Sequence, residues 1–407
     1  MEKLAIDGGT PVRKTPIYYG HQFVDSDDVE AVVKVLKSDY LTCGPAVTEL
    51  EKRLCGITGA GYAAAVSNGT AALHAACYAA GIENGDEVIT TPMTFAASAN
   101  CVLYMGAKPV FADIDPCTYN ISPESIEKKI NGRTKAVIAV DFTGQAAQLD
   151  EIREICHRNQ LQFIEDGAHS IGTAYKGKSV GSIADLTTFS FHPVKTVTGG
   201  EGGAVLTNDR RLYEKLLLFR THGITRNKSF MDLDSKLETD GRRTPEEWYY
   251  QQADLGYNYR LTDIQAALIT SQLGKLSRFK DIRKKIVKRY NDAFADFPGL
   301  VLQKEIEESD TVRHIYLLQL DLQSLKVGRE EIYAALKAEN VCCNVHYIPV
   351  YYFPYYQNLG YRKGLCPNAE KLYERILTIP LYPAMTDEDV DSVIAAVKKV
   401  VGFYLKR

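Results

Sequence analysis

The sequence has neither a long hydrophobic run nor an excess of charge of one sign. No part of its 407 residues approaches the roughly 18 consecutive apolar residues that a membrane-spanning helix needs. The opening segment, MEKLAIDGGTPVRK, lacks the apolar core of a secretory signal. The formal net charge is -3, and basic residues are interspersed with acidic ones. We therefore expect a cytoplasmic protein that binds neither membranes nor nucleic acid.

The sequence also lacks paired cysteines and internal repeats. It contains nine cysteines, none spaced as C-x-x-C, and the adjacent Cys342 and Cys343 could hardly bridge each other. This odd number and scattered spacing indicate a reducing compartment, and they predict no structural zinc and no other metal site.

What the sequence does contain is enough chain for two cores. A chain of 407 residues and 45.3 kDa favours a large domain plus a smaller one. Between residues 60 and 205, short apolar runs alternate with amphipathic stretches. This alternation predicts an α/β domain with a mostly parallel sheet covered by helices on both faces. We place this domain and an N-terminal segment in residues 1–260, and a linking helix with a smaller α+β domain in residues 261–407.

The expected elements follow this division. Strands are predicted at YAAAVSN, EVITTP, KPVFADID, KAVIAVDF, LQFIED, LTTFSF, GGAVLTND and HIYLLQLDL, and helices at 70–80, 123–130, 149–159, 209–220, 262–297, 329–340 and 386–405. Thr386 is the expected N-cap of the last helix, with Glu388 near its N3 position. Residues 224–247, which include Met231, Asp232, Asp234 and Arg242-Arg243, read as a surface excursion.

The first candidate for chemistry is Lys195, in FSFHPVKTVTGGEGG, which places one lysine between a strand and a glycine-rich turn. A lysine held in a pocket with a lowered pKa can act as the nucleophile that forms a Schiff base. Asp166 ends the apolar run LQFIED, where an unpaired carboxylate is costly. A pyridoxal ring needs such an anion opposite its ring nitrogen. The alternatives are a solvated surface lysine and a helix N-cap, respectively.

A third candidate is SNGTAALHAA, where a strand leads into an alanine-rich helix. The amides at the start of that helix, together with Asn68, Gly69 and Thr70, could bind a phosphate, although plain N-capping explains the segment alone equally well. Ser190 could add a hydroxyl to the same phosphate. Phe95, after another strand, could stack on a planar ring or could simply be a core residue.

These pieces, in this order, resemble the DegT/DnrJ/EryC1/StrS family of fold-type I aminotransferases. The motifs EDGAHSIG, FSFHPVKTVTGGEGG and LGYNYRLTDIQAA carry the resemblance, which extends from LAIDGGTPVRKTPI to LYPAMTDEDV. It implies a seven-stranded, mostly parallel sheet, pyridoxal 5'-phosphate (PLP) as cofactor, and a homodimer. The segments ITTPMTFAASANCVLYMGAKPVFADID, SFHPVK and VHYIPVYYFPYY most resemble the branch that aminates UDP-4-keto-6-deoxy-N-acetylhexosamines at C4 in pseudaminic acid synthesis.

The resemblance also implies roles for individual residues. Lys195 would bind the cofactor covalently and shuttle a proton, Asp166 would pair with the ring nitrogen, and His169 would lie on the phenolic side. Asn258 would reach the phosphate in the neighbouring subunit. Phe95 would stack on the ring, and the phosphate would be held by Gly69, Thr70 and Ser190. The sugar nucleotide would contact Tyr19, Asp39, Tyr40, Leu41, Thr42, Glu201, Arg260, His346, Tyr347, Ile348 and Pro349, although the YIPVYYFPYY run could instead be a packed aromatic loop.

Two departures from the family pattern stand out. Gly167 replaces the usual alanine or serine of the EDGAHSIG motif, and DFTGQ replaces the HxYG of many relatives, which suits the pseudaminic acid branch.

The reaction expected from the resemblance is a ping-pong transfer. An amino acid, by family expectation glutamate, converts the cofactor to pyridoxamine phosphate, which then aminates the keto-sugar. Amination of 4-keto-arabinose, a perosamine precursor or a 3-keto-sugar is the nearest alternative, because few side chains read a hydroxyl's orientation. A dehydratase is a further alternative. The 3-dehydratases of the same fold usually carry histidine in place of the lysine, so Lys195 argues against that reaction. A non-catalytic regulator or scaffold is the alternative from a different class.

Overall fold

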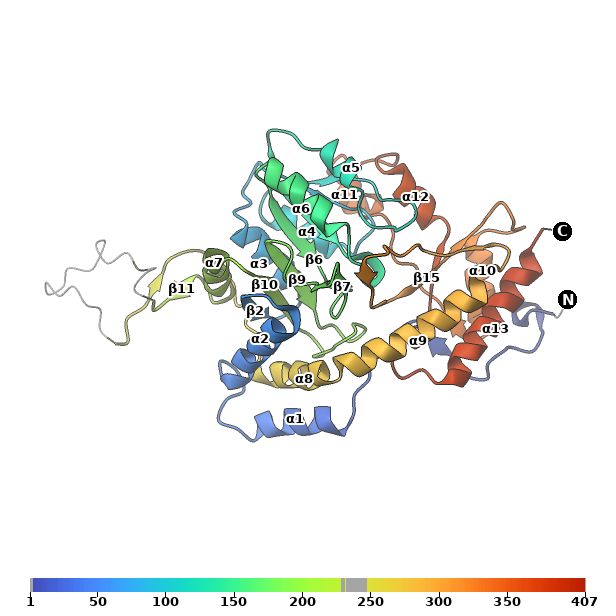
Figure 1. The fold of residues 1–407 in the computed structure, drawn as a ribbon, viewed down its shortest axis with the longest axis horizontal. Helices are drawn as coiled ribbons and strands as arrows, with labels where there is room; N and C mark the ends of the chain where they lie inside the picture. Colours follow the sequence, from blue (N-terminus) through green and yellow to red (C-terminus); the bar gives the residue numbers. More distant parts are fainter. Residues whose placement is uncertain (1–2, 228–230, 232–246, 407) are drawn as a thin grey trace, which may run out of the picture.

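A seven-stranded sheet forms the centre of the larger part of the chain. The computed structural model describes residues 3–227, 231 and 247–406 (Figure 1). The strand order is β2 (Tyr62–Val66), β10 (Gly203–Thr207), β9 (Leu186–Ser190), β6 (Gln162–Asp166), β5 (Thr134–Val140), β3 (Glu87–Thr90) and β4 (Lys108–Phe111). Strand β10 runs antiparallel to both neighbours, whereas β9, β6, β5, β3 and β4 are parallel. The predicted fold class is confirmed.

Helices cover both faces of this sheet. The side chains of β2 show the division, because Ala63 and Ala65 face one buried cluster while Ala64 and Val66 face the other. A strand buried on both faces needs apolar side chains at successive positions. The first cluster includes side chains of α2 (Pro45–Thr58), α6 (Leu149–Arg158) and α8 (Asp263–Gly274). The second includes α3 (Gly69–Ala79), α4 (Ala97–Tyr104) and α7 (Arg210–Arg220).

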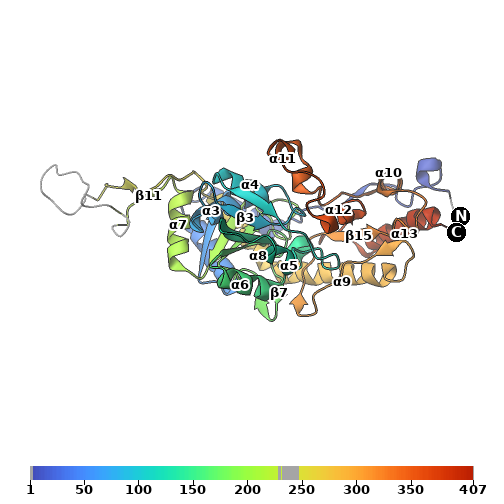
Figure 2. The same cartoon turned by 90° about the horizontal axis from the view of Figure 1, so that it is seen from above.

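The C-terminal part has its own core around a three-stranded sheet. Strand β15 (Tyr316–Leu320) lies between β13 (Leu300–Val301) and β17 (Ile376–Ile379). Helices α9 (Leu276–Phe294), α10 (Arg329–Ala338) and α13 (Asp387–Tyr404) contribute to this core. The first residues pack here as well, because β1 (Ile17–Tyr18) pairs with β16 (Val341–Cys342). The two ends of the chain consequently lie close together (Figures 1 and 2).

The remaining α-helices and strands, apart from the 11-residue α1, are short. They are α1 (Ser26–Leu36), α5 (Pro123–Glu127), β7 (Ala174–Tyr175), β8 (Lys178–Ser179), β11 (Ile224–Thr225), β12 (Gln251–Gln252), β14 (Ser309–Asp310), α11 (Pro354–Asn358) and α12 (Pro367–Tyr373). Most of the expected 224–247 excursion, including Asp232, Asp234 and Arg242-Arg243, falls outside the described residues. No helix among the described residues is both long enough and apolar enough to span a membrane.

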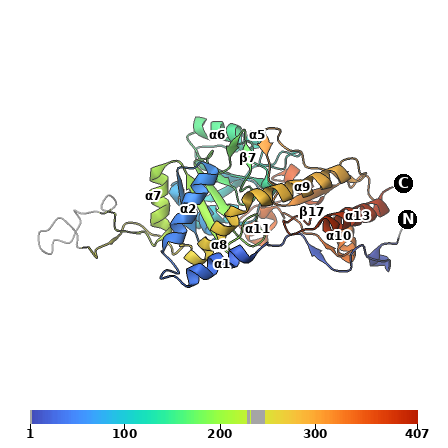
Figure 3. The same ribbon diagram turned by 60° about the horizontal axis from the view of Figure 1, so that its bottom comes forward.

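Two helix predictions need correction. The expected helix 262–297 is broken into α8 and α9 at Lys275, whose backbone has left the helical region (φ -102°, ψ 0°). Figure 3 shows α8 lying against α1, and Lys275 contacts Asp25 and Asp28 at the start of α1. In α13 the N-cap is Thr386, as predicted, but the N3 residue that completes the capping box is Asp389 rather than Glu388.

Candidate active site

A cavity of about 1070 Å³ opens at the carboxyl ends of the parallel strands. Asp166 ends β6, Ser190 ends β9, and Lys195 follows β9 in the loop to β10. The N-terminus of α3 and the turn before α4 complete this side of the cavity. Open α/β sheets place their ligands at this edge, because the loops there converge around a common space.

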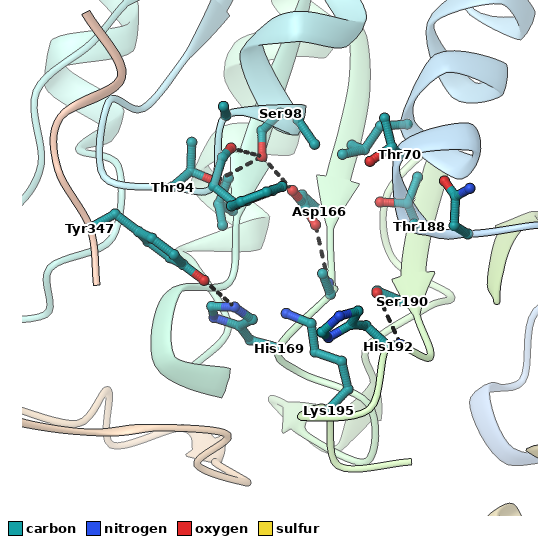
Figure 4. A pocket seen from close by; sticks show the side chains of 18 of the residues that line it. Thr70, Thr94, Ser98, Asp166, His169, Thr188, Ser190, His192, Lys195 and Tyr347 are labelled. Carbon is teal, nitrogen blue, oxygen red and sulfur yellow. Dashed lines mark hydrogen bonds between the residues drawn. The ribbon is translucent and has the colours of Figure 1, made fainter. Parts of the chain in front are cut away.

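Lys195 projects from a loop that closes on itself. The amide of Phe191 donates to the carbonyl of Gly202 at 2.8 Å, and the amide of Gly199 donates to the carbonyl of Phe191 at 2.9 Å. Figure 4 shows the lysine side chain entering the space that Asp166 and His169 also face. The loss of water around the amine lowers the pKa of Lys195 to about 8, against the opposing effect of the Asp166 charge. A substantial fraction of the amine is therefore neutral, and nucleophilic, near neutral pH.

Asp166 is buried and held by two donors. Its Oδ2 accepts a hydrogen bond from the Ser98 hydroxyl at 2.6 Å, and its Oδ1 accepts from the Ala168 amide at 3.1 Å. Burial raises the pKa of Asp166, while these two hydrogen bonds and the charge of Lys195 lower it. A positive group bound in the cavity beside Asp166 would lower its pKa further and so favour the carboxylate form.

The start of α3 forms a polar cradle that is suited to an anion such as phosphate. The Asn68 side chain caps the helix by accepting from the Ala71 amide at 2.8 Å. Gly69 packs so closely on Ser190 that an added Cβ would lie 2.8 Å from the Ser190 Cβ. The first amides of a helix have no partner within the helix, and its dipole favours an anion at this end. The hydroxyls of Thr70 and Ser190 also line this side of the cavity.

An aromatic wall closes one side of the cavity. Phe95 is 63% exposed although it is large and apolar, and its ring lies 6.4 Å from that of Tyr347. A free ring face of this kind can stack on a planar ligand. The Tyr347 hydroxyl and the His169 Nε2 are 3.1 Å apart. Burial, with the charge of Lys195, lowers the pKa of His169 well below its ordinary value, so this imidazole is neutral.

The residues of the cavity fit pyridoxal phosphate. An amine of lowered pKa, a buried carboxylate, an anion cradle and a free aromatic face all border one space. Among the described residues, there is no group of His, Cys, Asp and Glu that could hold a metal ion.

Thirteen of the predicted site residues line the cavity. They are Tyr19, Asn68, Gly69, Thr70, Phe95, Asp166, His169, Ser190, Lys195, Glu201, His346, Tyr347 and Ile348. The others do not line this cavity of the single chain: Asp39, Tyr40, Leu41, Thr42, Asn258, Arg260 and Pro349. Asn258 is exposed and pairs with Thr221, whereas Thr42 pairs with Thr262 at the surface.

Several cavity residues escaped the sequence analysis. Thr94, Ser98, His192 and His314 are among them. His314 is buried, and its ring lies 4.6 Å from that of His169. Ser98 could have been found from its spacing, because a residue three positions after Phe95 shares its helical turn. His314 gave no comparable pattern, since it precedes an ordinary apolar strand.

Comparison with known proteins gives consistent matches along the chain. Residues 22–398 match the model of the DegT/DnrJ/EryC1/StrS aminotransferase family. The spore coat polysaccharide biosynthesis protein SpsC of Bacillus subtilis is 40% identical over 385 residues, covering 94% of this chain and 96% of SpsC. PseC of Helicobacter pylori, an aminotransferase involved in the biosynthesis of pseudaminic acid, superposes with a TM-score of 0.87 at 30% identity, covering 96% and 100% of the two chains.

A further solved structure bears on the cofactor. Spr1654 of Streptococcus pneumoniae, in its PLP form, superposes with a TM-score of 0.86 at 29% identity, covering 96% of this chain and 100% of that one.

Proposed function

Because the chain belongs to the DegT/DnrJ/EryC1/StrS aminotransferase family, we propose that it aminates C4 of a UDP-linked 4-keto-6-deoxy-N-acetylhexosamine, with glutamate as the amino donor. At the coarser level, the protein is a PLP-dependent sugar aminotransferase that acts on nucleotide sugars. The observation that carries the proposal is the convergence of Lys195, Asp166 and the Gly69 cradle on one cavity.

We assign the cofactor roles to residues of the cavity. Pyridoxal phosphate, when bound, supplies the electron sink for the carbon that exchanges its amino group. Lys195 attaches the cofactor and moves a proton at its Nζ. Asp166 keeps a positive charge on the ring nitrogen, and the Gly69 turn with Ser190 holds the phosphate. Phe95 covers one face of the ring and excludes water from it.

The sugar is assigned to the wall opposite the phosphate cradle. Tyr19, His346, Tyr347 and Ile348 come from the N-terminal and C-terminal segments, and they border the same cavity as Lys195. The rings of Tyr19 and His346 are 5.0 Å apart. Aromatic and polar groups of this kind suit a sugar, which presents both apolar faces and hydroxyls. The likeness to PseC supports the choice of the C4-aminating branch.

The working unit proposed is a homodimer. Asn258 and Arg260 do not line the cavity of their own chain, and Asn258 is exposed. The cavity contains no arginine among its described lining residues. A partner subunit that brings Asn258 to the phosphate and Arg260 to the substrate would supply polar groups and a positive charge for these anions.

The substrate assignment is tested by product analysis. The purified protein, PLP and glutamate are incubated with a panel of UDP- and dTDP-linked 4-keto-6-deoxy sugars, to which 4-keto-arabinose and 3-keto-sugar nucleotides are added. We expect NMR to show an amino group at C4 of the UDP-linked N-acetylhexosamine. Preferred turnover of another member would replace the substrate proposal and keep the reaction class.

The Lys195→Ala variant is the control that shows whether the product depends on the proposed catalytic lysine. It should lose both the visible absorbance of the bound cofactor and transamination, because no other lysine lines the described cavity. If wild type took up no PLP and turned over no sugar in the panel, a scaffold or regulatory role would replace the proposed one.

A further inference from the structure

Two hydroxyl groups form a chain that ends on the carboxylate of Asp166. The Thr94 Oγ1 lies 2.7 Å from the Ser98 Oγ, and the Ser98 hydroxyl donates to the Asp166 Oδ2 at 2.6 Å (Figure 4). All three residues are buried, with exposures of 3%, 1% and 4%. A chain of this kind inside a protein is not screened by water.

The direction of the chain follows from counting protons. A serine hydroxyl has a single proton to donate. Since Ser98 gives its proton to the ionised Asp166, the contact between Thr94 and Ser98 requires Thr94 to be the donor. Both hydroxyls therefore point their protons toward the carboxylate. Each donor polarises the next, and together they favour the charged form of Asp166.

A purely local role for the Ser98 hydroxyl fits the distances less well. Serine in the first turn of a helix often bonds back to the backbone. Here the Ser98 Oγ is 3.4 Å from the Phe95 carbonyl, compared with 2.6 Å from the Asp166 Oδ2. The shorter contact is also the charge-assisted one, which is the stronger type of hydrogen bond.

The same turn also sets the aromatic wall. The Ser98 amide donates to the Phe95 carbonyl at 3.2 Å, so Phe95 and Ser98 belong to one rigid turn before and within α4. One end of this turn presents the ring of Phe95 to the cavity, and the other holds Asp166. The face of a planar ring and its nitrogen would therefore be fixed relative to each other by four consecutive residues.

We propose that Ser98, supported by Thr94, is a positioning residue that keeps Asp166 ionised and aimed at the ring nitrogen of pyridoxal phosphate. The inference rests on the proposed role of Asp166 as the partner of that nitrogen. Without Ser98, the Ala168 amide is the remaining hydrogen-bond donor to this carboxylate among the described residues. The proton shared between the carboxylate and the ring would then move toward Asp166, and the ring would lose its charge.

The test compares Ser98→Ala and Thr94→Val with wild type. The first variant removes the direct donor, and the second removes the supporting hydroxyl with little change of volume. Ser271→Ala is the matched control, because the Ser271 hydroxyl donates to Asp28 at the same distance of 2.6 Å, between α8 and α1. Each apoprotein is titrated with PLP, and the ¹⁵N chemical shift of ring-labelled PLP reports the protonation of the ring nitrogen.

Ser98→Ala should bind PLP roughly tenfold more weakly, the loss expected for a hydrogen bond to a charged group. Its ring-nitrogen shift should move toward the unprotonated value, with a smaller change in Thr94→Val and none in Ser271→Ala. Wild-type affinity and shift in both site variants would overturn the inference while leaving the proposed function intact. Failure of wild type itself to bind PLP would overturn both.

Discussion

At the scale of residues, Lys195 combines two features that act on its pKa in opposite directions. Its side chain is partly buried, which disfavours its charge, yet a carboxylate stands close enough to favour that charge. Desolvation prevails, and the amine titrates far below an ordinary lysine. The sequence predicted the residue and its lowered pKa because the motif placed it between a strand and a glycine-rich turn. The contribution of Ser98 was missed, because the turn that leads from Phe95 to the residue three positions later was not considered.

The lowered pKa predicts how cofactor capture depends on pH. The neutral amine is the reactive form, so the rate at which the apoprotein takes up PLP covalently should rise with pH through about 8 and then level off. Asp166→Asn should move this midpoint to lower pH, since the carboxylate charge raises the pKa of Lys195. Stopped-flow absorbance measures the rate.

The reaction of PLP with a blocked free lysine is the control for titration of the cofactor itself. A protein midpoint at the ordinary lysine value of 10.5 would contradict the prediction.

At the scale of elements, the carboxyl ends of β5 and β6 are joined by a pair of acids. Asp141 and Glu165 are fully buried, and each carboxyl group acts on the pKa of the other. Ser170 and the Ala147 amide donate to Asp141, at 2.6 and 2.9 Å. The Glu165 Oε2 accepts from the Thr187 hydroxyl at 2.8 Å, whereas the Glu165 Oε1 has no hydrogen-bond partner among the described residues, so we expect this pair of acids to share a proton.

Burial, chiefly, raises the pKa of Glu165 to about 7, above its ordinary 4.5. Between pH 4.5 and pH 7, the folded state therefore binds more protons than the unfolded state. This pair of acids stabilises the fold at low pH, and the stabilisation is lost as the pH rises through 7. Glu165→Gln keeps a hydrogen bond without titrating. The difference in unfolding free energy, wild type minus variant, should fall by about 1–3 kcal/mol between pH 4.5 and 7.

Denaturant unfolding of the apoprotein at a series of pH values measures this difference. The exposed Glu307→Gln serves as control, and its curve should stay parallel to that of wild type. A constant difference for Glu165→Gln would show that the pair shares no proton.

Elements were predicted well where their residues have one dominant period. The strands of the main sheet and the helices α3, α6 and α7 appear where expected, whereas α2 and α4 were not predicted and the helix expected at 123–130 ends at Glu127. The break between α8 and α9 was not predicted, because its cause lies far away in sequence: Lys275 contacts the acids at the start of α1. Asp389 is the N3 residue of α13 because it lies three positions after the N-cap, Thr386. The sequence analysis placed N3 one residue too early, near Glu388.

At the scale of the whole molecule, the N-terminal residues pack on the C-terminal core. The amides of Ala5 and Val12 donate to the buried Glu339 at 2.9 and 2.8 Å. Tyr19 reaches the cavity just after this segment. The sequence cannot reveal such pairing, because it joins residues more than 300 positions apart. The proposed division at residue 260 stays a prediction, as does the dimer.

The proposed dimer is tested by mixing damaged variants at a PLP concentration that saturates wild type but leaves Asn258→Ala largely unloaded. Lys195→Ala damages a site from its own chain, whereas Asn258→Ala should damage the partner's site and weaken PLP binding roughly tenfold. After subunits are exchanged, a mixed dimer of these two variants has one intact site, so activity should return. Lys195→Ala mixed with Asp166→Asn is the control, because neither site is then intact. Equal activity in both mixtures would rule out shared sites.

The closed loop that carries Lys195 has a consequence for the order of assembly. Its closing contacts join Phe191 to Gly199 and Gly202, which are near neighbours in the chain. Loops closed by near neighbours form with a small loss of chain entropy and can form early in folding. The backbone that carries the reactive amine is therefore ordered in part by near neighbours in the chain, and cofactor capture bears less of the entropic cost of ordering it.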